Sequence, residues 1–146
     1  MTMETQTYAN HRRFVPMYHG VLFLLFALTF IGSLVNLFQS FGDHQRLYSA
    51  SLIVVLVVGV IILCLFCRIF ALKAQDRAIR AEENLRHFVL TGKLLDPKLA
   101  TLQIVALRFA PDGEFVGLAR RAADENLAPD AIKRAIQQWR PDTYRV

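Results

Sequence analysis

The side chains with the widest range of binding chemistry are concentrated near the amino end of the chain, in front of a long apolar run. They are His11, Arg12, Arg13, Tyr18 and His19. Cations and amphipathic rings in this position are typical of an interfacial anchor that grips lipid headgroups. Tyr8 and Phe14 extend the same aromatic belt. The cations could instead form a recognition patch that docks a partner protein or the acidic pair Glu82 and Glu83.

Residues that could bind a metal or carry redox chemistry are few and badly spaced. Eight residues separate His11 from His19, His87 is far along the chain, and no carboxylate or cysteine stands at ligand spacing, whereas zinc needs three or four ligands. Cys64 and Cys67 form a C-x-x-C pair inside an apolar run, without a second pair. Packing is the expected role of these two thiols, with occasional lipidation as the alternative. We therefore predict no metal site and no cofactor.

The remaining polar residues do not form a pattern that catalysis requires. No nucleophile stands beside a base, no Gly-rich loop could cradle a phosphate, and adjacent acidic residues such as Glu82 and Glu83 point apart on a helix. The formal net charge of +5 is spread over a tail that mixes acidic and basic residues. Nucleic-acid binding needs a continuous basic face instead. We predict no catalytic residue, no enzymatic activity and no nucleic-acid partner.

Two long uncharged runs of the sequence predict the elements that hold these residues in place. The chain is 54% hydrophobic and only 20% charged, which departs from soluble averages. A hydrocarbon core of about 30 Å needs roughly 20 helical residues, and a helix satisfies its own backbone hydrogen bonds. We predict transmembrane helices at 17–38 and 49–72. An interfacial segment at 1–16 precedes them, and a short outer connector at 39–48 joins them.

The distribution of basic residues predicts how the spans are oriented. Arg12 and Arg13 precede the first span, and the connector contains only Arg46. Four more follow the uncharged part of the second span: Arg68, Lys73, Arg77 and Arg80. The positive-inside bias then places both termini in the cytoplasm. The short connector makes the spans an antiparallel hairpin.

Small and polar residues indicate where the two spans pack. In an antiparallel pair, residues whose numbers sum to about 88 lie at equal depth, and close helix approach in lipid favours small residues. The packing candidates are Ala27, Gly32, Asn36, Ser51 and Gly59. We predict a hydrogen bond between Asn36 and Ser51, with Asn36 facing interfacial water as the alternative.

Arg68 lies inside the apolar part of the second span. A side chain of this length can snorkel to the inner headgroups. It could also pair with a lipid phosphate, or with a ring at Tyr18 or His19, which the depth rule places beside it. Arg68 is therefore a candidate for lipid-headgroup contact.

The chain beyond the second span predicts a helical tail. Residues 73–91 contain strong helix formers and no Gly or Pro. An apolar row, which we name the stalk stripe, recurs at helical spacing: Ala78, Ala81, Leu85 and Phe88. The residues expected on the wet side, which faces water, are Arg77, Arg80, Glu83 and Arg86. Glu82 is expected to pair with Arg86. The stripe must cover the core of the tail, a sister copy or the membrane plane.

About three short helices are expected in a small cytoplasmic domain at 92–146. Asp96 and Pro97 predict a helix to about Phe109, with Leu99, Leu102, Ala106 and Phe109 on one face. Asp112 caps the next helix, to about Glu125, with Phe115, Leu118, Ala119 and Ala122 on its stripe. Asn126 is a left-handed stop. Pro129 begins the last helix, in which Ile132, Ala135, Ile136 and Trp139 are periodic before Pro141. The fold class is all-α.

Several segments together resemble a family of uncharacterised bacterial two-span inner-membrane proteins. The amino-terminal segment is YANHRRFVPMYH at 8–19, and the stalk is RAIRAEENLRHF at 77–88. The stretch QIVALRFA at 103–110 and the closing WRPD at 139–142 complete the match. The resemblance implies a multi-pass protein of the bacterial inner membrane, with its tail in the cytoplasm. It implies no catalytic or binding residue.

These expectations favour a structural or interaction role. A small integral membrane protein with a helical cytoplasmic tail would serve as an accessory, assembly or scaffold subunit. Its expected partners are membrane lipids and either a membrane protein or a second copy of itself. The alternative is a homo-oligomeric pore of the two-span type, although neither span has a polar face to line water.

Overall fold

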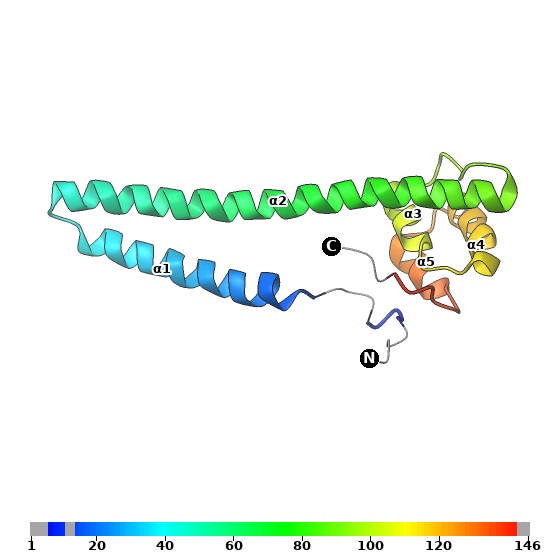
Figure 1. The fold of residues 1–146 in the computed structure, drawn as a ribbon, viewed down its shortest axis with the longest axis horizontal. Coiled ribbons are helices and arrows are strands. Elements are labelled where there is room, and N and C mark those ends of the chain that lie inside the picture. Colours follow the sequence, from blue (N-terminus) through cyan, green and yellow to red (C-terminus); the bar gives the residue numbers. More distant parts are fainter. Residues whose placement is uncertain (1–5, 11–13, 143–146) are drawn as a thin grey trace. The chain divides into compact units, whose positions relative to one another are not determined.

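The computed structural model describes residues 6–10 and 14–142. Within these residues the fold is all-helical, with five α-helices and one π-helical segment and no strand (Figure 1). The chain divides into two compact units, one formed by residues 13–70 and the other by residues 1–12 together with 71–146. We call them the apolar unit and the tail unit.

The apolar unit contains one long helix and the first part of a second. A π-helical segment, Met17–Leu22, leads into α1, Phe23–Gln39, and both lie in the first predicted span. The helix α2, His44–Thr91, begins in this unit and continues into the tail unit. Both are long and apolar enough to cross a membrane, judged by length and composition.

The connector between α1 and α2 is shorter than predicted. It was expected at 39–48, but α2 already begins at His44. Gly42, between the two helices, adopts a φ of 101°, which residues with a Cβ rarely adopt. Asp43 then caps α2, since its Oδ1 accepts hydrogen bonds from the backbone nitrogens of Gln45 at 3.1 Å and Arg46 at 3.2 Å.

The predicted continuity of α2 into the tail is confirmed. The helix runs without a break to Thr91, and Gly92, with a φ of 72°, ends it. The backbone nitrogen of Gly92 donates to the carbonyl of Phe88 at 2.7 Å, which is the bond expected of a left-handed C-cap. His87 also holds this end, because its Nδ1 lies 2.7 Å from the carbonyl oxygen of Lys93.

Three short helices follow in the tail unit: α3, Thr101–Leu107, α4, Asp112–Asp124, and α5, Pro129–Ala135. They enclose one apolar core. Its most completely buried large side chains are Phe109, Phe115, Ile104, Leu107 and Ile132. Figure 1 shows the three helices on one side of the carboxyl end of α2.

The start and face predicted for α3 are partly wrong. Asp96 caps a turn rather than the helix, as the backbone nitrogen of Lys98 donates to its Oδ1 at 2.8 Å, and α3 begins only at Thr101. Leu102 is 58% exposed, whereas Gln103 is buried. Gln103 rather than Leu102 faces the core because its side-chain amide is hydrogen-bonded there. Its Nε2 donates to the Leu127 carbonyl at 2.8 Å and so joins α3 to the loop before α5.

The predicted core face of α4 is confirmed. Its buried residues are Phe115, Leu118, Ala119 and Ala122. Asn126, with a φ of 48°, follows the helix in the left-handed region, as expected for the stop.

The last helix is shorter than predicted. It ends at Ala135 because Ile136 is extended, with a ψ of 121°, and the next two backbone nitrogens bond elsewhere. Those of Gln137 and Gln138 both donate to the Glu114 carboxylate at 3.0 Å. The extended chain after α5 brings Trp139 onto Phe109, with the two ring centroids 4.8 Å apart.

The face of α2 that is buried in the tail unit includes residues predicted to face water. All four residues of the stalk stripe are exposed, whereas Ile79 and Glu83 are buried at 7% and 6% exposure. Glu83 is buried because Arg86, which was also expected on the wet side, neutralises it at 2.9 Å. The more apolar face of this part of α2 is therefore left uncovered by the chain itself.

Candidate functional site

The sequence-predicted anchor residues fall partly outside the described part of the chain. His11, Arg12 and Arg13 lie in residues that the structure does not describe. Tyr18 and His19 lie in the π-helical segment before α1. The Nδ1 of His19 accepts a hydrogen bond from the backbone nitrogen of Val15 at 3.1 Å, so this ring is turned toward its own backbone.

Tyr18 and Arg68 come together inside the apolar unit. The guanidinium carbon of Arg68 lies 5.6 Å from the centroid of the Tyr18 ring. The Cys64 thiol lies 3.8 Å from the Tyr18 hydroxyl oxygen and donates to it. A cation over an aromatic face is an attractive contact, so the Tyr18 ring can hold Arg68 at this end of the spans.

The packing predicted at the small residues differs from the contacts found. The Asn36–Ser51 hydrogen bond is absent, because the Ser51 hydroxyl donates to the Tyr48 carbonyl within its own helix at 2.7 Å. A Cβ added at Gly32 or Gly59 would meet nothing within 4 Å, so neither glycine marks a close approach. Ala27 instead lines an apolar cavity of about 220 Å³. Its other lining residues are Phe23, Phe26, Phe30, Ile61, Cys64 and Leu65.

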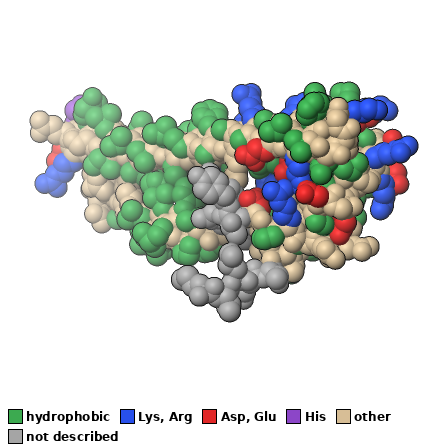
Figure 2. Space-filling view, turned by 45° about the vertical axis from the view of Figure 1, so that its right-hand side comes forward, with side chains coloured by type: hydrophobic (Ala, Val, Ile, Leu, Met, Phe, Trp, Pro, Cys, Tyr) green, Lys and Arg blue, Asp and Glu red, His purple; other side chains and the backbone are tan. Residues whose placement is uncertain are grey.

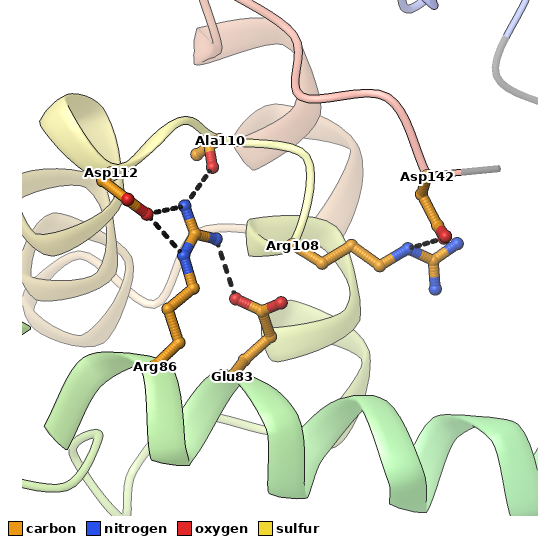
Figure 3. A network of polar contacts seen from close by, with 6 residues as sticks. All are labelled: Glu83, Arg86, Arg108, Ala110, Asp112 and Asp142. Carbon is orange, nitrogen blue, oxygen red and sulfur yellow. Dashed lines mark hydrogen bonds and ion pairs between the residues drawn. The ribbon is translucent and has the colours of Figure 1, made fainter. Parts of the chain in front are cut away.

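The densest polar cluster of the described chain surrounds Arg86 in the tail unit (Figure 3). Its guanidinium donates to Glu83 at 2.9 Å, to Asp112 at 2.6 Å and to the Ala110 carbonyl at 2.8 Å. The guanidinium carbon also lies 4.3 Å from the centroid of the Phe115 ring. Arg86 thereby joins α2 to the first turn of α4, where an acidic residue is favourable.

An open pocket of about 590 Å³ lies beside this cluster. It is lined by Glu82, Glu83, Arg86, Pro111, Asp112 and Arg140. Two of its three carboxylates, those of Glu83 and Asp112, are held by Arg86. These ion pairs hold both carboxylates between α2 and the first turn of α4.

A second polar cluster ties the amino-terminal segment to the tail. The Tyr8 hydroxyl donates to Oδ1 of Asp130 at 2.7 Å and accepts from Arg134 at 3.1 Å. The backbone nitrogen of Asp142 donates to the side chain of Gln6 at 2.7 Å. We name these contacts the terminal clamp. Tyr8 was expected in an aromatic belt, and only the fold could bring Asp130 and Arg134 to it.

The clamp changes the titration of its charged residues. The hydrogen bond from Tyr8, followed by the charge of Arg134, lowers the pKa of Asp130 below its ordinary value. The hydrogen bond to Tyr8, followed by the charge of Asp130, raises the pKa of Arg134. Since a lowered carboxyl pKa stabilises the folded state above the unfolded pKa, the contribution of Asp130 to stability is present at neutral pH and is lost as the pH falls through its folded pKa.

Metal-ligating residues do not gather in the part of the chain that the structure describes. No group of three or more His, Cys, Asp or Glu side chains that could hold an ion is found in residues 6–10 and 14–142. Cys64 and Cys67 are both free thiols. His87 is occupied at the end of α2, with its Nδ1 on the Lys93 carbonyl.

The fold and these clusters define a class: an all-helical protein in which two helices are long and apolar enough to cross a membrane. The chain belongs to DUF6526, a family of unknown function whose model matches residues 3–146. The expected membership of an uncharacterised family is thereby confirmed. No curated protein and no solved structure matches the chain.

Proposed function

We propose that this chain is a non-enzymatic integral protein of the bacterial inner membrane, which presents a helical cytoplasmic tail as an accessory, assembly or scaffold subunit. Residues of α1 and residues 49–72 of α2 would cross the membrane as an antiparallel hairpin. Both termini would lie in the cytoplasm, and membrane lipids and a membrane protein would be its partners.

The observation that carries this proposal is the exposure of large apolar side chains along α1 and the apolar part of α2. Hydrophobic side chains cover much of this surface, while charged side chains gather over the tail unit (Figure 2). Soluble proteins rarely leave so large an apolar surface uncovered, and lipid is the solvent that suits it. The exposed residues include Leu24, Leu28, Ile31, Val55, Leu56, Ile62 and Leu63.

The terminal clamp supports an even number of membrane crossings. Tyr8 lies before α1 and contacts Asp130 and Arg134, which lie after α2. Residues in direct contact must be on the same side of a bilayer. The chain between them must therefore cross twice or not at all, and two helices of sufficient length are available. The excess of basic residues outside the connector favours the cytoplasmic side.

The hydroxyl groups of the apolar helices support an anchor over the alternative of a pore. Thr29 donates to the Leu25 carbonyl at 2.8 Å, and Ser33 donates to the Phe30 carbonyl at 2.7 Å. Ser51 is bonded in the same way. Hydroxyls satisfied inside their own helix suit lipid, whereas a conducting pore needs polar groups that face water.

The topology is tested with reporters fused to the full chain in a bacterial host. Alkaline phosphatase, which is active only outside the cytoplasm, should be inactive when it is fused after Val146. A matched fusion that ends at Gly42, in the connector, should be active. Carbonate washing should leave the full chain in the membrane pellet. Phosphatase activity after Val146, or release by carbonate, would overturn the proposal.

The scaffold role is tested by purification of the full chain from native membranes in mild detergent. A partner protein should co-purify in comparable amount and should be lost when residues 92–146 are deleted. The deletion variant should still be retained by the membrane pellet. Ion flux through liposomes that contain only this chain, with no partner recovered, would favour the pore instead.

A further inference from the structure

The stalk stripe is part of a longer heptad pattern on α2. Counting back from Leu85 and Phe88 in alternate steps of three and four reaches Ala81, Ala78, Ala74 and Ala71. Leu85 is 63% exposed and Phe88 50% exposed, and of the four alanines only Ala71 is partly covered. Apolar residues that alternate in this way occupy positions a and d, the contact row of a coiled coil.

The tail of the same chain leaves this row free. In this register Ile79 and Arg86 occupy position b and Glu83 occupies position f, which lie on the outer face of a coiled coil. Ile79 and Glu83 are buried, and Arg86 pairs with Asp112 in the first turn of α4. One face of α2 thus carries the folded tail, and the other face remains open to another helix.

The charges beside the row indicate what that helix is. Arg77 occupies position g and Glu82, five residues later, occupies position e. In a parallel pair of identical helices, g of one chain faces the following e of the other, so Arg77 meets Glu82 twice by symmetry. In an antiparallel pair, each residue would meet its own kind and be repelled. Arg77 and Glu82 have no ion-pair partner among the described residues.

We propose that a second copy of this chain covers the stalk stripe, forming a parallel two-stranded coiled coil over Ala71, Ala74, Ala78, Ala81, Leu85 and Phe88. The parallel direction follows from the charges and agrees with the proposed membrane location, since two copies inserted in the same sense have parallel helices. About two and a half alanine-rich heptads are weak alone in water, and a shared membrane anchor raises their effective concentration.

The contact is tested by disulfide cross-linking of the full chain in membrane vesicles. Cys64 and Cys67 are first replaced by alanine, and a single cysteine is introduced as Ala81→Cys, at position d. The matched control is Arg80→Cys, on the neighbouring exposed residue at outer position c. Identical d positions of a parallel pair approach within disulfide range, so Ala81→Cys should yield at least about fivefold more dimer upon oxidation.

The charge pairing is tested in the Ala81→Cys background. Arg77→Glu and Glu82→Arg should each lower the yield of cross-linked dimer by roughly threefold, because each places two like-charged pairs across the contact. The double reversal should restore the yield. Fluorescence of Trp139, the single tryptophan, verifies that the tail remains folded in each variant.

Each outcome decides a separate question. Equal yields of cross-linked dimer from Ala81→Cys and Arg80→Cys, or no dimer from either, would overturn the coiled coil. A double reversal that yields less dimer than both single reversals would overturn it as well. A cross-link to a protein of different mass would assign the stripe to another partner. Carbonate extraction of the same vesicles reports on the membrane location alone, so the two proposals can fail independently.

Discussion

Arg86 shows how one side chain fixes the tail on α2. Its side chain is only 12% exposed, and it satisfies two carboxylates, a carbonyl and an aromatic face together. Glu83 is more deeply buried, at 7% side-chain exposure. A buried carboxylate that loses its cation is strongly destabilising, because its charge is left without compensation.

Replacement of Arg86 by methionine should therefore destabilise the tail unit. We expect Arg86→Met to lower the free energy of unfolding by about 3 kcal/mol. The matched control is Arg80→Met on the exposed side of the same helix, which should change it by no more than about 0.5 kcal/mol. Denaturant titration in detergent, followed by Trp139 fluorescence, measures both. Equal midpoints for the two variants would show that the Arg86 cluster does not hold the tail.

The sequence could identify the residues of this cluster but not their pairing. Glu82 at i−4 was the predicted partner of Arg86, on the ground that such pairs face one another on an exposed helix. The fold instead brings Asp112 to Arg86 from 26 residues away. The loop before α4 makes this approach, and no local spacing encodes it. The pairing of Tyr8 with Arg134 is beyond local reasoning for the same reason.

At the scale of elements, the end of α2 depends on the backbone conformation of one residue. Gly92 has a φ of 72°, and a Cβ at this position would meet no atom within 4 Å. Any cost of a side chain there is therefore a cost of backbone conformation alone. For residues with a Cβ, the left-handed region is unfavourable by roughly 1 kcal/mol or more.

Two glycine substitutions are expected to change the free energy of unfolding in opposite directions. Together they separate the effect of backbone conformation from the effect of steric space around the residue. Gly92→Ala should lower the free energy of unfolding by about 1 kcal/mol. Gly117→Ala, inside α4 and equally free of neighbours, should raise it by about 0.5–1 kcal/mol, since alanine is the better helix former. Thermal unfolding of the full chain, followed by Trp139 fluorescence, measures both. The same sign for the two variants would refute this account of the helix end.

Helices were predicted more accurately than the faces they bury. The all-helical class, the unbroken α2, its stop at Gly92 and the core face of α4 follow from propensity, periodicity and caps. The stalk stripe was an expected apolar face, yet Ile79 and Glu83 are buried instead. Periodicity shows that a face is apolar but not what covers it. The sequence left three occupants of that face open, namely the tail core, a sister copy and the membrane plane, whereas the face buried in the fold is the one that holds the Arg86 cluster.

At the scale of the whole molecule, the two units differ in where their large apolar side chains lie. Among the described residues, the buried core cluster of the tail unit runs from Leu95 to Ile136, with Trp139 packed against it. The apolar unit supplies none of these residues. Burial in a core of this kind is driven by water outside it, whereas the lipid environment proposed above suits the exposed apolar helices.

The tail unit should therefore fold when it is separated from the spans. A fragment of residues 71–146 is expected to be soluble and to unfold in one cooperative transition that Trp139 fluorescence reports. Phe115→Ala in this fragment should lower the free energy of unfolding by about 3–5 kcal/mol, because Phe115 is fully buried. Val89→Ala is the control and should have little effect, since Val89 is 75% exposed. A gradual, non-cooperative transition of the unmodified fragment would contradict this prediction.

The terminal clamp also sets an order of events during biosynthesis. Tyr8 and Arg134 are 126 residues apart, so the first of them leaves the ribosome long before the second is made. At about 5–20 residues per second, Tyr8 waits roughly ten seconds for its partner. During that interval α1 and α2 are both synthesised, because they lie between the two residues in the sequence. The clamp can therefore close only after both apolar helices have been made.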